Sequence, residues 1–491
     1  MMEQLPALQV VLPLFSALLC LLIRNKTASR LFAVAVSWGC LAIALILLQT
    51  VQKTGPISYH FGGWFPPLGI EYRIDLLNAY VLIIVAMISA VVLPFGVGHW
   101  GLSIPEGREY LFFCAFLLCI SGLLGITITG DVFNVFVFLE ITSLSSYALI
   151  AMGRNRRALR AAFTYLVMGT VGGTFILIGI GMMYLETGTL NMVDIANRLP
   201  LAHGSRTVLV AFAFLTVGVG IKLAVFPLHH WLPNAYSYAP ATVSAFLAAT
   251  ATKVSYYVLV RVIFTLFGAA YIFETLRFHA LLIPLSLLAM FVGSTVAIYQ
   301  TNIKRLLAYS SIAQIGYMTL GLSFASINGL TGGLVHLFNH ALMKGGLFLV
   351  LASVMHSVAS NEIDDMRGLG RKMPFTMAAF VLGGLSLIGV PGTVGFISKW
   401  YLVVAALEKG WYPIAVLILL SSFLAVIYIW RVVEIFFFRE PAAEKSIKEA
   451  PLSMLVPTWI LIGGTLFFGL QTEWTAGVAG SVANFLLGGL P

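Results

Sequence analysis

The chain has 491 residues, of which 60% are hydrophobic and only 10% charged, and its mean hydropathy is +0.97. Apolar runs of about 20 residues recur along it, which excludes a soluble globular protein and predicts an all-α integral membrane protein. The net charge of +9 comes from basic residues spread over separate loops, which argues against nucleic-acid binding. The loops are too short to form a soluble domain that could hold a cofactor.

The apolar runs predict about 14 transmembrane helices. Their expected bounds, in chain order, are 4–23, 31–51, 74–98, 110–129, 132–152, 161–185, 207–226, 241–266, 280–299, 309–327, 330–355, 375–404, 412–438 and 451–471. The last segment, 473–490, is rich in glycine and interrupted, so it is not predicted to span.

Basic residues lie mainly in the loops that follow odd-numbered helices. These residues are Arg24, Lys26, Arg30, Arg108, Arg154, Arg156, Arg157, Arg160, Lys304, Arg305, Arg367, Arg371, Lys372, Arg439, Lys445 and Lys448. Because cytoplasmic loops carry an excess of Lys and Arg, we expect the odd-numbered loops in the cytoplasm. Both termini are then expected on the outer side of an inner or plasma membrane.

Four ionisable residues interrupt these apolar segments: Glu140, Lys222, Lys253 and Lys399. A charge near the bilayer centre costs about 3 kcal/mol on insertion scales, so such residues are rare without a task. Each one alone could be a structural ion pair. Taken together they indicate a route for protons or cations. We expect Glu140 and Lys222 to pair, and the lysine to shed its proton when the carboxylate moves away.

Two predicted helices are interrupted in the same way. Segments 218–227 and 389–399 each combine glycines, a proline and one lysine, which predicts broken or kinked helices at mid-depth. These are helices seven and twelve of the count, so they cross the membrane in opposite directions. Corresponding broken helices of opposite polarity indicate an inverted repeat, although glycine and proline are also common in membrane helices.

The repeat divides the chain into four parts. We expect an N-terminal three-helix segment, a first five-helix repeat, a second inverted five-helix repeat, and a C-terminal helix and tail, at residues 1–109, 110–266, 280–438 and 439–491.

The eleventh predicted helix carries His336, His340 and Lys344 at a spacing of four, which places them on one stripe. Two histidines at this spacing could bind zinc, but a third ligand is missing and Lys344 would repel a cation, so no metal site is predicted. A stripe of groups that titrate on both sides of neutrality favours a proton relay. The alternative is that these side chains only bond neighbouring helices.

Other polar residues have simpler interpretations. Arg261, Arg431 and Glu434 lie near predicted helix ends, where snorkelling accounts for them. The charged loop 361–373 is expected to be a solvated face. His229 and His230 could lie at a proton entrance or in a solvated turn. The four cysteines read as small buried hydrophobic residues without iron–sulfur spacing: Cys20, Cys40, Cys114 and Cys119.

Several of these motifs resemble the antiporter-like subunits shared by Mrp-type multisubunit cation/proton antiporters, respiratory complex I and membrane-bound hydrogenases. The resemblance covers roughly residues 70–440. It is carried by segments 130–140, 226–233, 252–253 and 304–317, by the stripe from His336 to Lys344, and by Lys399. It places Glu140, Lys222, Lys253, His336, His340, Lys344 and Lys399 on the family's proton path. One branch has glutamate at the position of Lys399, which argues against that branch.

The resemblance implies a central polar axis and one proton path. It also implies that the chain functions in a complex with other hydrophobic subunits in a lipid bilayer, and that protons and Na⁺ are the ions involved. Segment 187–192 looks most like the D-type subunit of Mrp antiporters, whereas 365–370 also resembles complex I and hydrogenase relatives. The first hypothesis is therefore the D-type subunit of an Mrp-type monovalent cation/proton antiporter. The second is a proton-pumping subunit of a redox-driven complex, and the third a scaffold that transports nothing. No catalytic or cofactor site of its own is expected.

Overall fold

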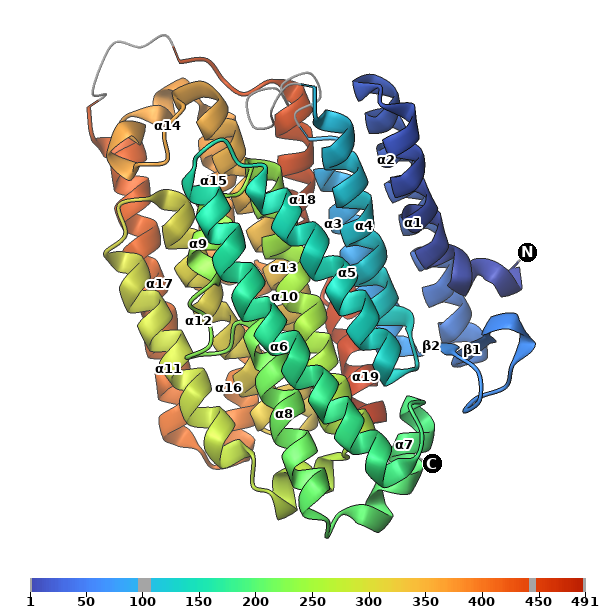
Figure 1. Ribbon diagram of the computed structural model, residues 1–491. Helices are drawn as coiled ribbons and strands as arrows, with labels where there is room; N and C mark the ends of the chain where they lie inside the picture. Colours follow the sequence, from blue (N-terminus) through green and yellow to red (C-terminus); the bar gives the residue numbers. More distant parts are fainter. Residues whose placement is uncertain (1, 96–106, 441–446, 489–491) are drawn as a thin grey trace.

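The computed structural model describes residues 2–95, 107–440 and 447–488 of the chain. Within these ranges the protein is a bundle of long helices that run roughly side by side (Figure 1). The end of the predicted helix 74–98, the basic residue Lys445 and the last two residues of segment 473–490 lie outside the described residues.

The N-terminal part supplies α1 (Leu5–Ile23), α2 (Lys26–Thr54) and α3 (Leu76–Val92). Helices α1 and α2 lie at one edge of the bundle (Figure 1). A short antiparallel hairpin joins α2 to α3 and pairs β1 (Ile57–His60) with β2 (Glu71–Ile74). This hairpin was not predicted from the sequence.

The next part of the chain contains α4 to α10. Their bounds are α4 Glu109–Ile128, α5 Val132–Ala151, α6 Arg157–Thr187, α7 Met192–Arg198, α8 Arg206–Leu223, α9 Leu232–Tyr238 and α10 Ala241–Val260. Helix α10 continues into a π-helical turn, Arg261–Leu266.

The remaining helices are α11 to α19. Their bounds are α11 His279–Ile298, α12 Ile303–Ser323, α13 Ile327–Val358, α14 Leu369–Lys372, α15 Pro374–Ile388, α16 Val394–Glu408, α17 Tyr412–Phe438, α18 Leu452–Leu470 and α19 Val478–Leu487. The segment that was not predicted to span forms a π-helical turn and the ten-residue helix α19.

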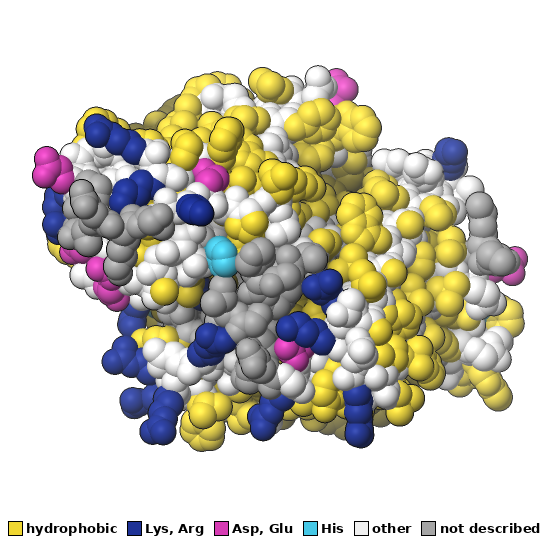
Figure 2. Space-filling model, turned by 90° about the horizontal axis from the view of Figure 1, so that it is seen from above, with side chains coloured by type: hydrophobic (Ala, Val, Ile, Leu, Met, Phe, Trp, Pro, Cys, Tyr) yellow, Lys and Arg dark blue, Asp and Glu magenta, His cyan; other side chains and the backbone are white. Residues whose placement is uncertain are grey.

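Burial separates central helices from peripheral ones. In the apolar stretches of α10 and α13, 94% and 78% of the residues are buried, whereas in α2 and α17 only 33% are. Helix α13 packs against α10, α12, α15, α16 and α18, so it lies at the centre of the bundle. The peripheral helices turn large apolar side chains outward, and these cover the flank at the right of Figure 2. Such a surface suits lipid or neighbouring membrane subunits.

Eleven helices within the described residues are long and apolar enough to cross a membrane, so the predicted count of about 14 is not confirmed. Three predicted helices account for the difference. Helix α3 is short, the predicted helix 375–404 is two separate helices, and α12 carries many polar residues although nearly all of its side chains are buried.

The two predicted interruptions, in segments 218–227 and 389–399, are present in the structure. Helix α8 ends at Leu223, three residues before the predicted end at residue 226. The next residue, Ala224, adopts a left-handed conformation with φ of 62°. Helix α15 ends at Ile388, and the next residue, Gly389, has φ of 91°. Five residues separate α15 from α16, which starts at Val394. A glycine is required at position 395, because a Cβ there would lie 1.8 Å from the carbonyl oxygen of Ser386. The inverted relation of the two halves and the domain bounds stay predictions.

Candidate functional site

The first pair of predicted site residues lies together between α5 and α8. The Nζ atom of Lys222, in the last turn of α8, is 3.4 Å from Oε1 of Glu140 on α5. It also donates a hydrogen bond of 2.6 Å to Oγ of Ser143, one turn further along α5. Lys222 is buried, and Glu140 is 28% exposed. Gly173 of α6 leaves space for the carboxylate, since a Cβ there would lie 2.5 Å from Oε1.

A second group of site residues surrounds α13. His336 and His340 have ring centroids 6.1 Å apart, and Nδ1 of His336 is 2.8 Å from Oγ of Ser398. His340 is fully buried, and neither of its ring nitrogens has a hydrogen-bond partner among the described residues. Burying an imidazole whose two nitrogens form no hydrogen bond costs free energy, so such a residue is more readily explained by a role in proton transfer.

Two buried lysines accompany these histidines. Lys344 of α13 donates to the carbonyl oxygen of Leu307 at 2.8 Å and to Oγ of Ser310 on α12. Lys253 of α10 donates to the carbonyl oxygen of Ala248, and α10 packs against α13. Both lysines are fully buried.

Lys399 lies at the break between α15 and α16. Its Nζ donates to the carbonyl oxygens of Leu387 at 3.0 Å and Ile388 at 2.7 Å, at the end of α15. These carbonyls have no partner inside the helix and carry the negative end of its dipole, so a cation is stabilised there. Nζ also lies 4.8 Å above the ring of Tyr317, which is 5.5 Å from the ring of His336. Tyr317 therefore lies between Lys399 and the histidine stripe.

The seven predicted residues thus form two groups. Glu140 and Lys222 make one, and Lys253, His336, His340, Lys344 and Lys399 make the other. No hydrogen bond joins Lys222 to Lys253 within the described residues. The second group holds amines and imidazoles and no carboxylate. Hard cations such as Na⁺ prefer oxygen ligands, whereas amines and imidazoles take up and release protons.

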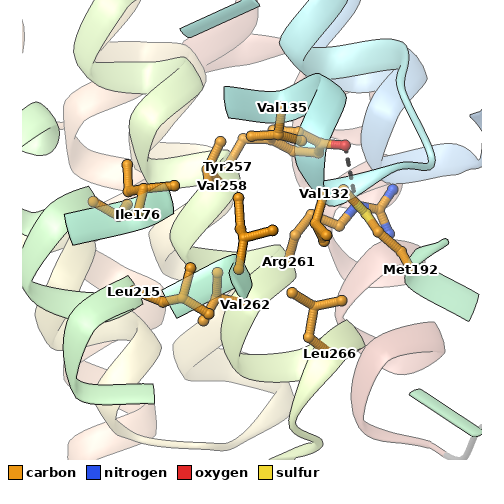
Figure 3. A pocket seen from close by; sticks show the side chains of 12 residues that line it. Val132, Val135, Ile176, Met192, Leu215, Tyr257, Val258, Arg261, Val262 and Leu266 are labelled. Carbon is orange, nitrogen blue, oxygen red and sulfur yellow. Dashed lines mark hydrogen bonds between the residues drawn. The ribbon is translucent and has the colours of Figure 1, made fainter. Parts of the chain in front are cut away.

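One interpretation from the sequence is wrong. Arg261 was expected to snorkel at a helix end, but it is only 6% exposed and lies inside the protein. Its guanidinium is 2.6 Å from Oδ1 of Asp75 and 2.5 Å from Oδ1 of Asn78, and it donates to the hydroxyl of Tyr257 at 3.1 Å. Figure 3 shows this last bond beside an apolar cavity of about 30 Å³ lined by residues such as Val132 and Leu266.

Tyr257 and Arg261 are four residues apart in the sequence, which places them on one face of a helix, and this spacing is the signal in the sequence for the network. Asp75 could not be paired with Arg261 from the sequence, because the two are separated by most of the first half of the chain. The other peripheral predictions agree better with the structure. Glu434 forms an exposed pair with Arg439 at 3.2 Å, and the charged loop exposes its Asp364–Arg367 pair.

Comparison with known proteins places this chain in a family. The family model described as NADH:quinone oxidoreductase/Mrp antiporter, TM, matches residues 129–425. The chain is 42% identical to a Desulforudis audaxviator protein named as the N-type subunit of NADH-quinone oxidoreductase, over 96% of this chain and 97% of that protein. It is 31% identical to a Bacillus subtilis protein named as the D-type subunit of a Na⁺/H⁺ antiporter, over 98% and 96%.

Two solved structures share the fold. A chain of the membrane-bound sulfane sulfur reductase, described as an archaeal respiratory membrane complex, superposes with a TM-score of 0.89 at 29% identity, over 99% of this chain and 98% of that one. A chain of the Mrp complex from Dietzia sp. DQ12-45-1b gives a TM-score of 0.90 at 24% identity, over 99% and 97%. The chain therefore belongs to the family of antiporter-like membrane subunits found in NADH:quinone oxidoreductases and Mrp antiporters.

Proposed function

We propose that this chain translocates protons as one subunit of a multisubunit membrane complex. The observation that carries this proposal is the number of titratable groups buried in its interior, most of them without an opposite charge beside them among the described residues. They are Lys222 with its partner Glu140, and the group of Lys253, His336, His340, Lys344 and Lys399. Retaining unpaired amines inside an apolar protein is costly, and a proton path is a reason to retain them.

The geometry suggests how protons would move. The ammonium of Lys222 is stabilised by Glu140 and Ser143, so a movement of the carboxylate would destabilise the charged form and release its proton. At the other end, the carbonyl oxygens at the break of α15 stabilise a proton on Lys399. His336 and His340 lie between amines and can pass a proton through their two ring nitrogens. Lysine suits these positions because arginine would not release its proton.

Two host complexes are candidates. An Mrp-type antiporter, which exchanges Na⁺ or another monovalent cation for protons, is supported by the 31% identity to the Bacillus subtilis antiporter protein and by segment 187–192. A redox-driven complex is supported by the 42% identity to the Desulforudis audaxviator oxidoreductase protein and by the 29% identity to the sulfane sulfur reductase chain. The 42% identity exceeds the 31% identity and favours the redox-driven host.

Both hosts imply the same surroundings. The partners are other hydrophobic subunits, and the remaining surface faces lipid of the inner or plasma membrane. We place the face in Figure 2 in the cytoplasm, because Lys and Arg side chains are distributed over it, and both termini on the outer side.

The test is to isolate the complex from native membranes through a tag on this chain, identify its subunits, and reconstitute it in liposomes. Proton flux driven by a Na⁺ gradient supports the antiporter, and flux driven only by an electron donor supports the redox-driven pump. Glu140→Ala and Lys222→Ala should each abolish the flux. Flux that persists in both variants at normal assembly would leave the scaffold hypothesis standing.

A further inference from the structure

A polar cup opens on the face that carries the predicted cytoplasmic loops. It has a volume of about 760 Å³ and lies where the turn after α5, the junction of α9 and α10, the start of α12 and the end of α13 meet. The titratable side chains that line it are Arg154, Arg157, Lys304, Arg305, His356 and Glu362. The cup therefore offers water a large polar volume at the junction of the two predicted repeats.

Lys304 differs from the other basic residues of the cup. It was expected in a loop, but α12 begins at Ile303, so Lys304 lies in the first helical turn and is only 1% exposed. Its Nζ donates a hydrogen bond of 2.8 Å to the carbonyl oxygen of Ala239, at the junction of α9 and α10. Within the described residues it forms no salt bridge. A structural lysine in a cytoplasmic loop would instead be expected to reach solvent.

Helix α12 connects Lys304 to the candidate site. Leu307 and Ser310 follow it on the same helix, and both bind Nζ of Lys344. Ser310 is six residues beyond Lys304, which is about 9 Å along the helix axis at 1.5 Å per residue. Two flexible lysine side chains and a bridging water can span a separation of this order. Lys304 therefore lies about one to two turns of α12 away from the residues that bind Lys344, on the side of the cup.

Resting on the proposed function, we propose that Lys304 is the residue through which protons enter the site from the cup, taking a proton from water there and passing it to Lys344. The chemistry balances without a further reactant. The neutral amine of Lys304 accepts a proton from hydronium or water in the cup, and its ammonium then returns to the neutral amine as Lys344 becomes protonated. Arg154, Arg157 and Arg305 keep their charge and can only shape the field around this step.

The experiment uses the whole complex in liposomes and compares variants of Lys304 with matched controls. Lys304→Met should lower proton flux about tenfold or more, the size expected when a proton-transfer group is removed. Lys304→Arg should fail equally, because it keeps the charge and can keep the contact with Ala239 but does not release a proton. Lys448→Met changes an exposed lysine that does not line the cup, and it should leave flux unchanged.

Accessibility gives a second measurement that does not depend on flux. In a variant without the four natural cysteines, Lys304→Cys should react with a membrane-impermeant thiol reagent added on the side of the cup and not with reagent from the other side. Full flux in Lys304→Met or Lys304→Arg, or a cysteine protected from reagent on the cup side, would overturn the inference.

Lys399→Ala, measured in the same liposomes, separates the two proposals. If it loses flux while Lys304→Met keeps it, the entrance is wrong and the proposed function stands. If Lys399→Ala itself keeps full flux, the proposed function fails, and the entrance with it. Should Lys304→Met fail to assemble, Lys304→Arg and the labelling decide.

Discussion

The buried pair of Asp75 and Arg261 allows a quantitative prediction. Nη2 of Arg261 lies 2.6 Å from Oδ1 of Asp75, and the two side chains are only 8% and 7% exposed. Removing one partner of a buried pair leaves an uncompensated charge and costs about 3–5 kcal/mol, whereas replacing both with apolar groups is often nearly neutral. Asp75→Ala and Arg261→Met should therefore each lower the free energy of unfolding by about 3–5 kcal/mol.

The double variant should lose much less than the sum of the two single losses. Because removing the second charge should cost little once the first is gone, we expect a coupling energy of at least about 3 kcal/mol. Unfolding of the purified chain in detergent micelles, titrated with sodium dodecyl sulfate and followed by tryptophan fluorescence, measures all four proteins of the cycle. Asp194→Ala is the matched control, because it removes a partly exposed salt bridge in which Nη2 of Arg198 lies 2.8 Å from Oδ2 of Asp194. It should lower the free energy of unfolding by less than about 1 kcal/mol. Additive losses at Asp75 and Arg261 would refute the reasoning.

Two further predictions concern the backbone at the ends of site helices. Gly395→Ala should lower the free energy of unfolding by about 1–3 kcal/mol and reduce assembly in native gels, because the added Cβ would overlap the main chain at Ser386. The control Gly463→Ala should assemble normally, because no atom lies within 4 Å of the added Cβ. Asp131→Ala should cost about 1 kcal/mol, because Oδ1 of Asp131 accepts a 2.9 Å bond from the amide of Asn134 at the start of α5. Asp131→Asn keeps an acceptor and should recover most of that loss in the same unfolding titration; equal losses would contradict the capping role.

The site residues that could be predicted from sequence are those whose surroundings made them unusual. Glu140 and Lys222 stand out from apolar neighbours, and the expected pair is present at 3.4 Å. His336, His340 and Lys344 were connected by helical spacing alone, which needs no knowledge of the partner helices. Local sequence determines these features, so they could be predicted without the fold.

The residues that could not be predicted depend on contacts between distant segments. Arg261 and Lys304 each lie near a helix end, where exposure is the usual outcome, and only the packing of α3 and α9 against them shows that they are buried. Helix α12 was predicted to begin at residue 309, but it begins at Ile303 and includes the basic residues Lys304 and Arg305. That polarity is explained by its contacts, since α12 faces protein and not lipid.

Proton flux through the intact complex tests the central claim most directly. Complexes that contain wild-type chain, Lys399→Ala or Lys409→Ala would be reconstituted at equal assembly and driven by their own energy source, with internal pH followed by a trapped dye. Lys399 is buried against the end of α15, whereas Lys409 is exposed at the end of α16. Loss of flux only in Lys399→Ala is the predicted result. Equal flux in all three would contradict a proton path through these buried amines.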